Sequence, residues 1–69
     1  MALPKAVVKR IMTDSTGGLR VSGSALDAAV AAAEDYLARL GKAAQESAED
    51  NRRKTLMDGD IASARQRIG

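Results

Sequence analysis

Apolar side chains recur at helical spacing in three segments of this chain. In the first segment, Val7, Val8, Ile11 and Met12 follow the i, i+1, i+4, i+5 pattern of one helical face. Pro4 suits a first helical turn, so we expect a short helix over residues 4–13. The glycine-rich and polar residues 14–18 predict the loop that ends it.

The second segment is the longest. Its apolar positions are spaced by three or four residues and form one stripe: Leu26, Val30, Ala33, Leu37, Leu40, Ala44 and Ala48. Ser22 and Ser24 are candidate N-caps, and only Gly41 weakens the segment before residue 50. A helix of this length is roughly 40 Å long. One small domain cannot cover such a rod, so we expect it to pack against a second copy or to lie exposed.

The third segment carries Met57, Ile61, Ala64 and Ile68 on one face. Thr55 and Asp58 match a capping box, which predicts that this helix starts near Leu56 with Thr55 as its N-cap. The sequence therefore predicts a single all-α domain over residues 1–69, with a short, a long and a short helix joined by two loops.

Composition excludes several classes of function. The 69 residues contain no cysteine and no histidine, so we expect no disulfide, no metal site and no cofactor. No nucleophile has a histidine base and no phosphate-loop motif is present, so we expect no catalytic residue. Tyr36 is the only aromatic residue, which argues against single-strand binding. The lack of cysteine, signal peptide and long apolar run favours an intracellular protein without a membrane segment.

The charge pattern favours an anionic partner. Residues 1–20 carry four cations against one acid, residues 21–50 two against six, and residues 51–69 five against two. Arg52, Arg53 and Lys54 run directly into the third helix, where loop cations and free N–H groups suit a phosphate. Asp60 is placed to hold the Arg53 guanidinium in a fixed orientation.

Several of these residues, taken in order, resemble the archaeal (prokaryotic) histones. The similarity rests on Leu3-Pro4, Arg10, Arg20-Val21-Ser22, Arg53-Lys54-Thr55 and Asp60-Ile61, and it covers essentially the whole chain. It implies a histone fold in which two chains dimerise head to tail, with their long helices crossing near the centres. It also implies a dimer core that contains Leu26, Val30, Ala33, Leu37, Leu40, Ala44, Ile61 and Ile68.

The same resemblance implies that the dimer binds, bends or wraps double-stranded DNA without reading its sequence. Arg10 resembles the arginine that enters the minor groove, Arg20 a first-loop phosphate contact, and Lys54 and Thr55 the second-loop backbone contacts. Arg53 and Asp60 resemble the structural ion pair of that loop. The full set of expected DNA-binding residues is Lys5, Lys9, Arg10, Arg20, Arg52, Lys54 and Thr55. The resemblance places the protein on the chromosome or nucleoid in the cytoplasm.

The sequence also departs from the family pattern. Thr13 stands where relatives often have lysine, and Arg52 replaces the usual glycine, which predicts either loop strain or an added phosphate contact. The positions of the dimer–dimer contact hold Ser47, Asp50, Asp60 and Ser63, whose facing acids should repel. We therefore expect a homodimer, or a heterodimer with a paralogue, that tetramerises weakly off DNA. Gly17 resembles a glycine that lets dimers stack on DNA.

Other interpretations stay open. Taken alone, the cations from Arg52 to Lys54 fit a solvated loop equally well, and Lys9 and Arg10 fit the wet face of a helix better. Only the joint pattern favours DNA. One alternative is a ribbon–helix–helix regulator, although four residues before the first helix leave little room for its strand. The other is a histone-fold module that serves only to dimerise within a transcription complex.

Overall fold

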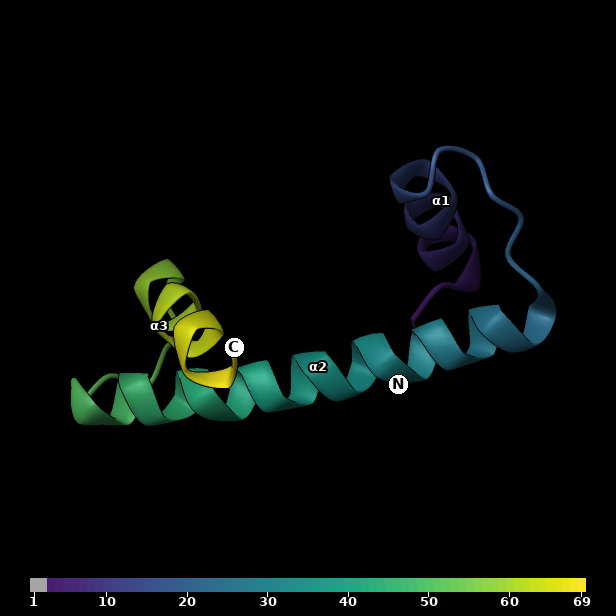
Figure 1. Cartoon of the computed structure of the whole chain (residues 1–69). Coiled ribbons are helices and arrows are strands. Elements are labelled where there is room, and N and C mark those ends of the chain that lie inside the picture. Colours follow the sequence, from purple (N-terminus) through teal and green to yellow (C-terminus); the bar gives the residue numbers. More distant parts are fainter. Residues whose placement is uncertain (1–2) are drawn as a thin grey trace. The chain divides into compact units, whose positions relative to one another are not determined.

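The computed structural model describes residues 3–69, which form three α-helices and no strand (Figure 1). Helix α1 spans Lys5–Ser15, α2 spans Gly23–Asp50 and α3 spans Asp58–Ile68. The prediction of an all-α chain with a short, a long and a short helix is confirmed. The helices belong to two compact units, one ending at Asp35 and the other running from Tyr36 to Gly69.

Helix α1 ends in a glycine-dependent turn. The Gly18 N–H donates to the Thr13 carbonyl at 2.9 Å, and Gly17 has φ +73°, the left-handed conformation that glycine adopts without a steric penalty. The hydroxyls of Ser15 and Thr16 donate to the carbonyls of Ile11 and Met12. These bonds satisfy carbonyls of the last turn, and α1 extends two residues beyond the predicted end.

Helix α2 is capped at both ends by specific bonds. The Ser22 hydroxyl accepts the Ala25 N–H at 3.1 Å, so Ser22, rather than Ser24, is the N-cap. At the other end, the Arg52 N–H donates to the Glu49 carbonyl and the Arg53 N–H to the Ala48 carbonyl, both at 2.9 Å. This pair of bonds is a Schellman motif.

The predicted start of the third helix is wrong. Helix α3 begins at Asp58 with Met57 as its N-cap, so Thr55 is not the cap and the helix does not start near Leu56. The reason is that the Asp60 carboxylate, at the third helical position, accepts the Met57 N–H at 2.9 Å. A carboxylate of the first turn of α3 thus satisfies the backbone donor at the helix start.

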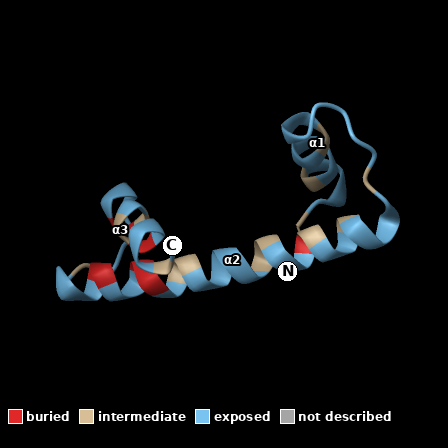
Figure 2. Ribbon diagram, in the orientation of Figure 1, coloured by how far each residue is buried: buried red, intermediate tan, exposed pale blue. Residues whose placement is uncertain are grey.

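The second unit has a small core of alanines. Ala43 and Ala44 of α2 meet Ala64 of α3, and Leu40, Ile61 and Ile68 pack against them. Buried positions of α2 and α3 are red in Figure 2. Ala48 is buried as well. Small side chains allow the two helices to approach closely, but they bury little apolar area.

The first unit buries even less. Val30 is its buried apolar residue, and an apolar hollow of about 310 Å³ lies beside it, lined by Leu3, Pro4, Val7, Val8, Ile11, Met12, Ala29 and Ala33. Of the expected dimer core, Val30 and Ala44 are buried within the chain, Leu37 is half exposed, and Leu26, Ala33, Leu40, Ile61 and Ile68 are partly buried.

Across residues 3–69, no helix is long and apolar enough to cross a membrane.

Candidate nucleic-acid interface

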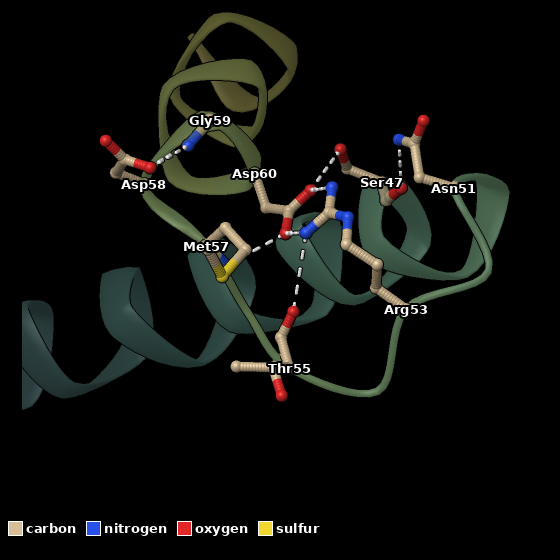
Figure 3. A network of polar contacts seen from close by, with 8 residues as sticks. All are labelled: Ser47, Asn51, Arg53, Thr55, Met57, Asp58, Gly59 and Asp60. Atoms are coloured by element: carbon tan, nitrogen blue, oxygen red, sulfur yellow. Dashed lines mark hydrogen bonds and ion pairs between the residues drawn. The ribbon is translucent and has the colours of Figure 1, made fainter.

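A bidentate ion pair fixes the second loop against α3 (Figure 3). The two guanidinium Nη atoms of Arg53 lie 2.6 and 2.8 Å from the two carboxylate oxygens of Asp60. Asp60 is only 1% exposed, and it also accepts the Met57 N–H and the Ser47 hydroxyl, the latter at 2.7 Å. Four donors therefore saturate the buried carboxylate, which is the arrangement that makes a buried charge tolerable.

These bonds keep both members of the pair ionised. The hydrogen bonds from Arg53, then from the Met57 N–H and the Ser47 hydroxyl, hold the pKa of Asp60 well below its usual range, although burial opposes this shift. The hydrogen bond to Asp60 in turn raises the pKa of Arg53. Arg53 therefore uses its charge within the chain, as a brace for the loop rather than as a free cation.

The loop around this brace presents two other cations and a hydroxyl residue to solvent. Arg52, Lys54 and Thr55 are exposed, and within residues 3–69 the side chains of Arg52 and Lys54 have no hydrogen-bonding or ionic partner. Lys54 lines a shallow hollow together with Arg53 and Glu49. The Arg53 guanidinium also donates to the Thr55 carbonyl at 3.4 Å. The second loop thus carries two exposed cations, Arg52 and Lys54, on either side of Arg53, whose ion pair with Asp60 anchors the loop to α3.

A second cationic surface lies in the first unit. Lys9 of α1 and Arg20 of the first loop line one hollow of about 330 Å³, with Thr13 between them in sequence. Arg10 is exposed, and like Lys9 and Arg20 it has no partner in the described part of the chain. Lys5 differs, because its ammonium lies 3.1 Å from the Asp27 carboxylate. Both side chains of that pair are 66% exposed, so the pair is weak and open to exchange.

The structure describes the residues of the expected dimer–dimer contact within one chain. Ser47 and Asp60 are buried in the network around Arg53. Asp50 is exposed and lies 4.0 Å from Arg67, which also pairs with Glu46 at 3.5 Å. The weak contact between dimers stays a prediction.

Sequence reasoning missed Ser47 as a ligand of Asp60. The signal was present, because Ser47 follows Ala44 by three residues and so continues the stripe of α2 that faces α3. A hydroxyl at a stripe position calls for a polar partner across the helix contact, and Asp60 is that partner. The bond from the Met57 N–H to Asp60 was also missed, because the helix was expected to start near Leu56 with Thr55 as its N-cap.

Comparison with protein families gives one match. The model of the core histone H2A/H2B/H3/H4 domain matches residues 5–67, which include all three helices except the last residue of α3. No curated protein and no solved structure matches the chain.

Proposed function

Because the chain belongs to the core histone family, we propose that it is a chromatin protein of the archaeal histone type that binds double-stranded DNA without sequence preference. The family is a structural, DNA-binding family without enzymatic activity, and its members associate with chromatin. In the proposal the protein lies on the chromosome, in the nucleoid of the cytoplasm, and it bends, wraps or compacts the duplex. The fold overturns the ribbon–helix–helix alternative, since residues 3–69 contain no strand.

A second copy of the chain is the partner that we propose for the apolar side chains that stay exposed in each of the two units. Ile11 is 59% exposed and Leu37 50% exposed, and the apolar hollow of the first unit is open. A 69-residue chain with an alanine core gains little free energy from its own burial, so association is the natural source of the rest. The same surface could take a paralogue, which would give a heterodimer. The dimer is proposed to tetramerise weakly off DNA, because Ser47 and Ser63 at the expected dimer–dimer contact offer little apolar area, and to stack on DNA near Gly17.

The observation that carries the DNA proposal is the division of the cations into paired and unpaired sets. Lys5, Arg53 and Arg67 have carboxylate partners, whereas Lys9, Arg10, Arg20, Lys42, Arg52, Lys54 and Arg65 have none within residues 3–69. An unpaired surface cation can neutralise a phosphate and release a counterion without first breaking an ion pair. Of these unpaired cations, Lys9, Arg10, Arg20, Arg52 and Lys54 were expected to bind DNA, with Arg20 and Lys54 at the phosphate backbone and Arg10 in the minor groove.

Binding to random-sequence duplex DNA across a salt series tests this function. We expect affinity to fall steeply with salt, and single-molecule extension to show shortening of the DNA if the dimer wraps it. The triple variant Arg10→Ala, Arg20→Ala and Lys54→Ala should lose DNA binding and keep the dimer. A charge-matched control is Lys42→Ala, Arg65→Ala and Arg67→Ala, which should bind nearly as well as the wild type.

The second candidate function is a dimerisation module without DNA binding, and the exposed apolar face favours it. A dimer that does not bind DNA even at low salt would establish that candidate and refute the first. Equal loss of affinity in the two triple variants would mean that net charge, rather than the named residues, directs binding. Lengthening or stiffening of the DNA would replace wrapping by end-on coating.

A further inference from the structure

Asp58 and Gly59, at the start of α3, form the only Asp-Gly pair in the sequence, which has no Asn-Gly pair. In an Asp-Gly pair the aspartyl carboxyl and the nitrogen of the next peptide bond can close a five-membered ring, because glycine has no side chain that shields this nitrogen. The other five aspartates precede serine, alanine, tyrosine, asparagine or isoleucine, whose side chains hinder the same ring closure. The chain therefore has one residue pair in which this reaction is unhindered.

The structure brings the two reacting groups of this pair together (Figure 3). The Gly59 N–H donates to Oδ1 of Asp58 at 3.1 Å, so the carboxyl lies beside the nitrogen that would attack it. Asp58 is exposed, and a Cβ added at Gly59 would meet no atom within 4 Å. The pair is thus open to water, and no neighbouring side chain blocks the movement of the carboxyl.

The first turn of α3 leaves the Gly59 nitrogen outside the helical hydrogen bonds. The Met57 carbonyl accepts the N–H groups of Asp60 and Ile61, at 3.0 and 3.3 Å. The Gly59 N–H precedes these donors, and within residues 3–69 its partner is the Asp58 carboxylate alone. Helix ends also fray, so the backbone rotation that ring closure requires is easier here than within a helix.

We propose that Asp58 is a site of spontaneous isoaspartate formation in the folded protein. The Gly59 nitrogen attacks Cγ of Asp58 and closes a succinimide ring, while one carboxyl oxygen leaves as water with the amide proton and one proton from solvent. Water then opens the ring and releases a proton, so the net change is an isomerisation. Opening at Cγ restores aspartate. Opening at the α-carbonyl carbon gives isoaspartate, in which the chain runs through the side-chain carbons and the α-carboxylate is free.

Isoaspartate at residue 58 should loosen the start of α3. It adds one carbon to the backbone between Met57 and Asp60, and the 2.9 Å bond from the Met57 N–H to the Asp60 carboxylate spans this segment. Because Ser47 and Arg53 hold the Asp60 carboxylate in place, the Met57 bond should break before the carboxylate moves. The Asp58 carbonyl, which a helix uses to accept the N–H four residues on, becomes a carboxylate. This effect does not depend on DNA binding.

Incubation of the folded protein at neutral pH and physiological temperature over several weeks tests the proposal. Trypsin cleaves after Lys54 and Arg65 and releases a peptide that contains both Asp58 and Asp60. Chromatography with mass spectrometry assigns the isomer, and enzymatic methylation of the free α-carboxylate quantifies it. We expect isoaspartate to accumulate at residue 58 and not at Asp60 or Asp27. The purified isoaspartyl form should have a Tm lower by roughly 4 to 8 °C, the shift expected for loss of one helix cap.

Two variants are matched controls for the ring closure. Asp58→Glu keeps the charge but lengthens the side chain, so the five-membered ring cannot form. Gly59→Ala adds a methyl group that fits the open space, hinders the nitrogen and favours the helix. Neither variant should accumulate isoaspartate at residue 58.

A sample unfolded in guanidinium chloride gives the reactivity of the pair without its helix. Isoaspartate at residue 58 in this sample but not in the folded protein would overturn the proposal, because the start of α3 would then protect the pair. Its absence from both samples, or equal accumulation in wild type and Asp58→Glu, would overturn the proposal as well. An isoaspartyl form with the wild-type Tm would refute the inferred loss of the Met57 cap.

Discussion

Replacement of Leu37 by alanine tests the proposed dimer most directly. Leu37 lies in the apolar stripe of α2, yet half of it remains exposed in the single chain. Full burial of a leucine side chain contributes about 1.5–3 kcal/mol, so the exposed half offers about 0.75–1.5 kcal/mol per chain to a partner. With one Leu37 from each chain, the dimer should lose about 1.5–3 kcal/mol. That loss raises the dimer Kd roughly ten- to hundredfold.

Sedimentation equilibrium over a range of protein concentrations measures this Kd. The matched control is Lys42→Ala, which lies on the same helix, is exposed, and has no partner among residues 3–69. Leucine, lysine and alanine all favour helix, so neither substitution should melt α2 by itself, and circular dichroism checks this. A Leu37→Ala Kd within twofold of the control would refute the reasoning, because it would mean that no partner covers this part of α2.

Three further predictions concern Asp60, Ser22 and Thr55. Asp60→Asn should lower Tm at neutral pH, and it should reduce the fall in the free energy of unfolding between about pH 4 and pH 2. The depressed pKa of Asp60 contributes stability that is fully present above the ordinary carboxyl pKa and is lost as pH falls below about 4; denaturation from pH 7 to 2 measures it. Ser22→Ala should cost about 1 kcal/mol in urea unfolding, since it removes the cap on the Ala25 N–H. Thr55→Ala should leave Tm unchanged, because Thr55 is not a cap, and should weaken binding to duplex DNA.

Each prediction has a control in the same chain. Asp58→Asn changes an exposed first-turn acid of α3 and should leave the acid limb largely intact. Ser24→Ala removes a hydroxyl that caps nothing and should cost much less than Ser22→Ala. A drop in Tm for Thr55→Ala comparable to that of Ser22→Ala would contradict the assignment of the α3 cap to Met57.

Local rules predicted the parts of this fold that local contacts determine. The apolar spacing gave the three helices, and the Ser22 cap and the Gly17 turn lie where short-range hydrogen bonds require them. The Thr55 cap failed because an acid follows three residues after both Thr55 and Met57, and the capping box that forms is the one between Met57 and Asp60. The donor that matters, the Met57 N–H, is satisfied by Asp60, which Arg53 and Ser47 hold in place from the preceding loop and from α2.

In the second loop, the sequence distinguished Arg53 from its two cationic neighbours, because Asp60 was expected to hold its guanidinium, and the structure places the Asp60 carboxylate against it. Arg52, Arg53 and Lys54 are equivalent in charge, but the structure gives them different tasks. Arg53 is committed to a carboxylate that is saturated by four hydrogen bonds. That commitment fixes the backbone between its neighbours, so the charges of Arg52 and Lys54 stay outside the chain. The Arg53–Asp60 pair thus leaves the charges of Arg52 and Lys54 without a partner within residues 3–69, which supports the proposal that these two cations neutralise phosphates.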